Sequence, residues 1–173
     1  MHRYFDPAVG RYISADPIGQ LSDVNLYGYV RNNPLRYADP LGLDWEYSQS
    51  SGSVTHVDNA TGERTSAGTG YSGHGEGLNN PAMENLPNVG PITQGTYDIG
   101  PQQDNVTGSG TTLPGSLRLD RRGDPDPYGR SGFLIHGDNR RGDQSASQGC
   151  PVVPRNVRNQ IGSSGDNTLR VVP

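Results

Sequence analysis

The chain contains the stretches Gly132-Phe-Leu-Ile-His-Gly137 and Cys150-Pro-Val-Val-Pro154, in which short apolar runs are bounded by glycine or proline. Similar runs recur across the C-terminal half, at residues 91–99, 116–119 and 168–172. Short apolar runs between turn-forming residues are typical of β-strands. The sequence therefore predicts an all-β fold, mainly strands with one or two short helices.

Only residues 154–161 have the features of a helix, because Pro154 begins this segment and Gly162 follows it. Residues 44–66 are polar and rich in serine and threonine. We expect them to be a linker that contains a β-hairpin with its turn at Asn59-Ala-Thr-Gly62. Residues 67–173 would then form the folded domain, and residues 1–43 a short, non-globular tail.

Composition excludes several classes of function. The chain has 173 residues, a net charge of -4 and 14 cationic side chains, all of them arginine. Without lysine there is no Schiff base and no phosphate-loop lysine. The slightly acidic balance does not predict a nucleic-acid partner, and no apolar run is long enough to predict membrane insertion. The low apolar content of 30% predicts a small core with long connections.

Cys150, the only cysteine, follows His136 by fourteen residues. A lone cysteine forms no internal disulfide, so it is either a buried, inert side chain or a reactive thiol. Histidine is the usual base for a cysteine nucleophile. Residues 118–158 carry eight arginines against five aspartates, which favours a thiolate and an anionic substrate. Spacing alone leaves both interpretations open.

Two glycines adjoin this pair. We expect the carbonyl of Gly137 to hold the His136 imidazole in one tautomer. Gly149 permits a tight turn before the cysteine, so the amides of Gly149 and Cys150 would point towards a developing oxyanion.

The N-terminal segment resembles the end of an Rhs (rearrangement hot spot) repeat core. The resemblance lies in His2-Arg-Tyr-Phe-Asp-Pro7, Asp16-Pro-Ile-Gly19, Asn25-Leu-Tyr-Gly-Tyr-Val30 and Asp39-Pro-Leu-Gly-Leu43. It implies that a toxin domain follows and that Asp16 and Asp39 belong to self-cleavage motifs, with the cut after Leu43. It also implies an Rhs core, a secretion apparatus and a cognate immunity protein as partners.

The C-terminal segment resembles L,D-transpeptidases (YkuD-like), especially the type VI-secreted effectors. The matching blocks are His136-Gly137, Ser147-Gln-Gly-Cys150, Tyr71-Ser-Gly-His-Gly75 and Gly90-Pro-Ile-Thr-Gln-Gly-Thr-Tyr97. The resemblance implies a β-sandwich or barrel with Cys150 as nucleophile and His136 as base. Gly137 would orient His136, and Gly149 would contribute to the oxyanion hole.

By the same resemblance, the substrate is a peptidoglycan stem tetrapeptide, cut to a tripeptide or exchanged with a D-amino acid. We expect a secreted effector that acts in the periplasm of a target bacterium, with no cofactor and no metal. The candidate substrate-binding residues are Tyr71, Ser72, His74, Arg130 and Ser147. The loop with Asp138 and Asp143 is expected to be mostly solvated.

Three alternatives remain open. His136, Asp138 and Asn139 would be the residues of a metal-dependent nuclease toxin. His74-Gly-Glu76 resembles the His-x-Glu of zinc deaminases, but the second thiol of that site is missing. The domain would otherwise be a non-catalytic, cell-wall-binding module.

Overall fold

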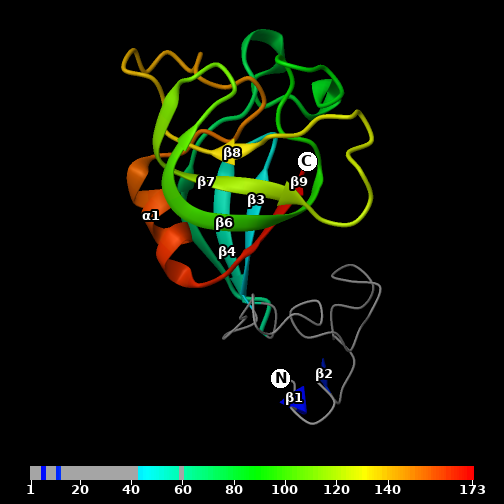
Figure 1. The fold of residues 1–173 in the computed structure, drawn as a ribbon. Coiled ribbons are helices and arrows are strands. Elements are labelled where there is room, and N and C mark those ends of the chain that lie inside the picture. Colours follow the sequence, from blue (N-terminus) through cyan, green and yellow to red (C-terminus); the bar gives the residue numbers. More distant parts are fainter. Residues whose placement is uncertain (1–4, 7–10, 13–42, 59–60) are drawn as a thin grey trace.

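A computed structural model describes residues 5–6, 11–12, 43–58 and 61–173 (Figure 1). Asp16 and Asp39 lie outside the described residues. Leu43 is the first residue of a strand and pairs with Asp58, so the expected cut after Leu43 falls inside regular structure. In the described part of the chain, no helix is long and apolar enough to cross a membrane.

The fold is mainly β, as the sequence predicts. A short antiparallel pair joins β1 (Phe5–Asp6) to β2 (Arg11–Tyr12). The other strands form one seven-stranded sheet in the order β5-β4-β3-β9-β6-β7-β8. They are β3 (Leu43–Ser48), β4 (Ser53–Asp58), β5 (Arg64–Thr69), β6 (Gly95–Val106), β7 (Thr112–Arg121), β8 (Leu134–Ile135) and β9 (Thr168–Val172).

The sheet bends around a single core. Buried side chains of β3 and β4 belong to the same apolar cluster as those of β6, β7 and the helix α1 (Arg155–Ser164). In Figure 1, β6 and β7 curve across the face of the sheet that β3 and β4 form. Two 3-10 helices, Gly75–Gly77 and Pro81–Met83, lie in the long connection between β5 and β6.

Within residues 44–58 and 61–66, where we expected a linker, three strands belong to this sheet. Asn59 and Ala60 of the expected turn lie outside the described residues. The predicted hairpin is present as β4 and β5, but β3 also pairs in parallel with β9 near the C-terminus. The reason is the alternation of Trp45 and Tyr47, which are 2% and 1% exposed and lie opposite Leu169 and Val171. Two large aromatic side chains on one face of a strand stabilise it by burial.

The helix is longer than the sequence predicts. It begins at Arg155, passes through Gly162 and ends before Gly165, whose φ of 81° is left-handed. Gly162 lies inside the helix because a Cβ there would come within 2.5 Å of Oε1 of Gln102 on β6. Close packing against β6, and not helix termination, accounts for this glycine.

The predicted strands agree with the sheet in part. Residues 168–172 match β9, and residues 116–119 lie inside the longer β7. Residues 91–99 only overlap β6, which begins at Gly95. In residues 150–153, Val152 alone forms β-bridges, one to Tyr71 and one to His136.

Candidate active site

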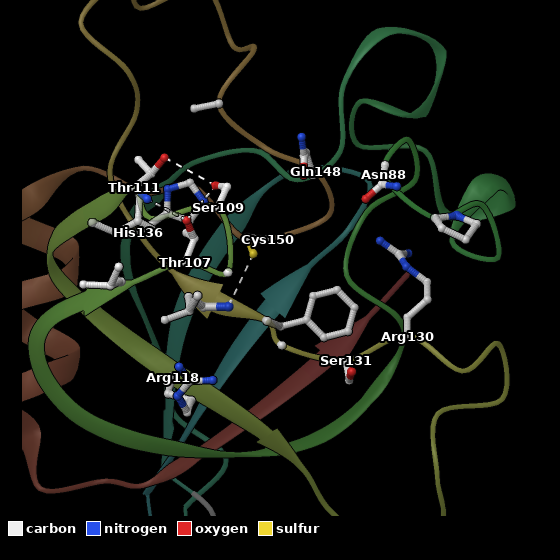
Figure 2. Close-up of a pocket in the computed structure, with 18 of the residues that line it drawn as sticks. Asn88, Thr107, Ser109, Thr111, Arg118, Arg130, Ser131, His136, Gln148 and Cys150 are labelled. Atoms are coloured by element: carbon white, nitrogen blue, oxygen red, sulfur yellow. Dashed lines mark hydrogen bonds between the residues drawn. The ribbon is translucent and has the colours of Figure 1, made fainter.

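His136 and Cys150 are brought together by backbone pairing. The N–H of His136 donates to the carbonyl of Pro151 at 3.0 Å, and the N–H of Val153 donates to the carbonyl of His136 at 2.9 Å. The amide of Leu134, two residues before the histidine, donates to Sγ of Cys150 at 3.4 Å. Figure 2 shows both side chains at one pocket.

The imidazole of His136 is oriented by the next residue. Its Nδ1 lies 2.8 Å from the carbonyl oxygen of Gly137. A carbonyl only accepts, so Nδ1 carries the proton and Nε2 keeps its lone pair in the neutral ring. His136 is 4% exposed, and burial lowers its pKa, as does nearby Arg158 to a smaller degree. The predicted contact with Gly137 is therefore present, and the ring is neutral at neutral pH.

The thiol of Cys150 differs from our expectation. Burial raises its pKa, and the Leu134 amide and the charge of Arg130 oppose that rise without cancelling it. The arginine-rich sequence context favoured a thiolate, but the desolvation of a buried thiol outweighs it. Both shifts favour the uncharged forms, a thiol at Cys150 and a neutral imidazole at His136.

The amide of Gly149 is not free for an oxyanion. It donates to Oγ of Ser147 at 3.0 Å. Glycine is nevertheless required here, because φ is +119° and a Cβ would lie 2.0 Å from Nη2 of Arg130. The amide of Cys150 makes no hydrogen bond within the described ranges. The oxyanion donor would therefore be Cys150 itself.

Ser147 and Ser72 were predicted to bind substrate, but both are fully buried. Oγ of Ser147 donates to the carbonyl of Cys150 at 2.7 Å and accepts from the amides of Gly73 and Gly149. Oγ of Ser72 donates to the carbonyl of Gly149 at 2.9 Å and accepts from the amide of Ile92 at 2.8 Å. Their hydroxyls satisfy buried backbone groups and so position the cysteine loop.

Tyr71 and His74 also support this loop and do not line the pocket of Cys150. The hydroxyl of Tyr71 donates to Asp138 at 2.6 Å, and its pKa is raised by burial and by that carboxylate. Nδ1 of His74 lies 3.1 Å from the carbonyl oxygen of Ser147. Asp138, which we expected in a mostly solvated loop, is thus anchored to the domain.

The pocket of Cys150 has a volume of about 570 Å³. Arg130 lines it, as expected of a binding residue, but its guanidinium is committed elsewhere. It donates to the carbonyls of Glu84, Pro91 and Gly90 at 2.6, 2.5 and 3.1 Å. Burial lowers its pKa, and the residue is 9% exposed. Arg130 therefore holds the connection before β6 against the cysteine loop.

The residues on the other side of the pocket were not predicted from the sequence. Arg118 on β7 and the hydroxyls at the β6–β7 turn line it together with the cysteine (Figure 2). The alternation of Leu117, Arg118 and Leu119 places the arginine on the face of β7 away from the core. The pairing of β7 with β8 decides that this face borders Cys150.

Among the described residues, no group of three or more His, Cys, Asp or Glu side chains is placed to hold a metal ion. Neither alternative metal site is therefore part of such a group. The nuclease alternative rested on His136, Asp138 and Asn139, and the deaminase alternative on His74 and Glu76. Asn139 instead bonds to Asp143 and Ser145 within its own loop.

The domain is mainly β, and one of its pockets is lined by both a cysteine and an oriented histidine. The Tlde1 domain model matches residues 66–171, which is more than half of the chain. The chain therefore belongs to the Tlde1 domain family. No solved structure matches it.

Short matches relate the chain to Rhs-type toxins. Toxin subunit YenC2 of Yersinia entomophaga is 56% identical over 46 residues, 25% of this chain and 5% of that protein. The probable deoxyribonuclease RhsA of Dickeya dadantii is 54% identical over 41 residues, 24% and 3% of the two chains. The double-stranded DNA deaminase toxin A of Burkholderia cenocepacia is 46% identical over 46 residues, 27% and 3%. The chain thus spans a very small part of these relatives.

Proposed function

We propose that this chain is an antibacterial toxin domain that transfers acyl groups of peptidoglycan stem peptides through Cys150. The observation that carries the proposal is the pairing in one pocket of the thiol with an imidazole whose Nδ1 is fixed by Gly137. A fixed tautomer leaves Nε2 as the proton acceptor that a neutral thiol requires.

The reaction follows from the protonation states. Nε2 of His136 takes the thiol proton as Sγ of Cys150 attacks the carbonyl of the third stem residue. The Cys150 amide donates to the oxyanion of the tetrahedral intermediate. As the intermediate collapses, the carbon–nitrogen bond breaks, and His136 returns the proton to the amine of the leaving D-alanine. A thioester then joins Cys150 to the shortened stem.

The thioester is resolved by water, by the amine of a free D-amino acid or by a second stem. In each case His136 takes a proton from the attacking group and returns it to Sγ. Water gives a tripeptide, and a D-amino acid gives an exchanged tetrapeptide. Hydrolysis removes tetrapeptide stems and exchange replaces their last residue, so normal cross-linking in the target cell would suffer.

Delivery is proposed from the N-terminal segment. Its resemblance to an Rhs core, and the short matches to Rhs-type toxins, support export with such a core by a type VI or similar apparatus. On this proposal the domain acts in the periplasm of the target bacterium, and a cognate immunity protein protects the producer. The relatives' names range from toxin subunit to deoxyribonuclease and deaminase, so the shared stretch does not itself specify a reaction.

The direct test incubates the purified chain with tetrapeptide muropeptides and follows the products by mass spectrometry. We expect a tripeptide and free D-alanine and, when a D-amino acid is added, an exchanged tetrapeptide. Cys150→Ala should abolish every product while keeping the circular dichroism of the wild type. Ser131→Ala, which changes an exposed side chain of the same pocket, should remain active.

Absence of tripeptide, exchange and 3-3 cross-linked products from the wild type would overturn the proposal. Full toxicity of Cys150→Ala in the periplasm of a sensitive cell would overturn the thiol mechanism in particular.

A further inference from the structure

We propose that Arg118 is the carboxylate-binding residue of the Cys150 pocket, where it holds a free carboxylate of the stem peptide. The ligand's identity rests on the proposed function, whereas the prediction of an anion site rests on the structure alone. The evidence is the position of Arg118, its lack of a partner and the charge of the pocket lining.

The position of Arg118 follows from strand register. Arg118 lies directly opposite Leu134 in the antiparallel pair of β7 and β8. The amide of Leu134 is the donor to Sγ of Cys150. Opposite residues in such a pair project to the same face, and Leu134 shares its face with His136 two residues later. Arg118, Leu134 and His136 all line the pocket.

The neighbouring pair confirms this assignment of faces. Leu117 and Ile135 also lie opposite each other and are 1% and 2% exposed in the core. Their side chains fill the other face of the two strands. Arg118 is therefore held by the strand on the face that borders the pocket, and Figure 2 shows it among the lining residues.

Arg118 has an unused charge. Within the described residues Arg118 has no hydrogen bond or ion pair. By contrast, the last residue of β7, Arg121, and the next residue, Arg122, each form an ion pair. Nη1 of Arg121 lies 3.8 Å from Oδ2 of Asp126, and Nη2 of Arg122 lies 2.8 Å from Oδ1 of Asp98. An exposed guanidinium without a partner needs no internal bond broken before it binds a ligand.

The pocket lining strengthens the case. It contains two arginines, Arg118 and Arg130, and no aspartate or glutamate, in a protein whose net charge is -4. The guanidinium of Arg130 already donates to three carbonyls, so it adds positive potential to the pocket but has no pair of N–H groups free for a ligand. Arg118 supplies such a pair of N–H donors, and a guanidinium binds a carboxylate through two parallel hydrogen bonds.

The stem peptide has two candidate carboxylates close to the reacting carbonyl. One is on the side chain of the third stem residue, which by the family resemblance is a diaminopimelate and whose carbonyl is attacked. The other is the C-terminus of the leaving D-alanine. Both present the same chemistry to a guanidinium. Their contributions separate when each is converted to an amide in turn.

The test measures binding without turnover, on the Cys150→Ala background, by calorimetry. We expect Arg118→Gln to weaken binding of the tetrapeptide roughly 10- to 100-fold, the range for hydrogen bonds between charged groups. Arg118→Lys should recover part of that loss. Arg140→Gln, which removes an exposed arginine that does not line the pocket, is the matched control and should bind as tightly as the parent.

Amidated peptides then identify the carboxylate. The peptide that lacks the bound carboxylate should bind the parent weakly and lose little more on Arg118→Gln, while the other amide keeps the full effect. An equal loss for the tetrapeptide and both amides, or no loss for the tetrapeptide, would overturn the proposal.

The two proposals fail in distinguishable ways. If the wild type forms no product but Arg118-dependent binding is seen, the acyl-transfer mechanism is wrong and the carboxylate site stands. If product forms and the KM of Arg118→Gln matches that of the wild type, the site is wrong and the mechanism stands.

Discussion

The two sides of Cys150 are built in opposite ways. On the side of the cysteine loop, Ser72 and Ser147 are fully buried, and their hydroxyls bond to the surrounding backbone. On the side of β7, Arg118 is exposed and has no partner among the described residues, and Thr107, Ser109 and Thr111 bond only within their own turn.

The difference separates support from recognition. Groups whose hydrogen bonds are already made inside the protein fix geometry, since breaking those bonds costs more than a new ligand returns. Groups that face a pocket with bonds still to make are the ones that bind. The sequence motif around Cys150 lies mostly on the supporting side, and the side that we propose for substrate recognition lies on a strand that the motif does not include.

The largest expected effect comes from the base itself. His136→Ala should lower kcat about 10²- to 10⁴-fold, the usual contribution of general acid–base catalysis. Muropeptide turnover followed by mass spectrometry measures it. His56→Ala is the control, because His56 pairs with Asp166 and is not part of this pocket. Turnover by His136→Ala within a factor of a few of the wild type would contradict the role of His136.

A substitution on the supporting side should lower the free energy of unfolding. Ser147→Ala leaves the amides of Gly73 and Gly149 and the carbonyl of Cys150 without this hydroxyl. Each buried group left unpaired costs about 1–3 kcal/mol of unfolding free energy, and urea denaturation measures the sum. Ser131→Ala, an exposed change, should stay within about 0.5 kcal/mol of the wild type. Equal stability of the two variants would mean that the loop is not held by Ser147.

The pH dependence tests the neutral pair. Because burial lowers the pKa of His136, the acidic limb of kcat/KM should fall below about pH 6.5, the ordinary histidine value. The same shift makes the unfolded state bind more protons, so stability is complete above that pH and declines as the pH falls towards the lowered pKa. An acidic limb above neutral pH would contradict a lowered pKa for His136.

The smallest effect is expected at the β6–β7 turn. Thr107→Val removes a hydroxyl that lines the pocket and bonds only to Ser109 and to the amide of Thr111. One neutral hydrogen bond is worth about 1 kcal/mol, so KM should rise severalfold at most and kcat should hold. A large fall in kcat would place this turn in the chemistry rather than in binding.

Local patterns were sufficient for much of the fold. The apolar run at residues 168–172 predicts strand β9, and Pro154 predicts the start of α1. Both signals are local, because they involve residues that are neighbours in the chain. The contact of His136 with Gly137 joins adjacent residues, so it too was predictable. The end of α1 was not, because Gly162 responds to the packing of Gln102 and only Gly165 turns left-handed.

Long-range pairing decided the rest. Parallel pairing of β3 with β9 joins Trp45 to Leu169 and turns an apparent linker into an interior strand. In the site, the residue types of Cys150 and His136 suggested the thiol chemistry that we propose, whereas long-range backbone pairing brought the two side chains to one pocket. The tertiary structure decided that Ser147 braces the loop, that the guanidinium of Arg130 is occupied and that Arg118 has no partner among the described residues. Hydrogen bonds and burial act only between atoms in contact, and the bent sheet sets which atoms are in contact.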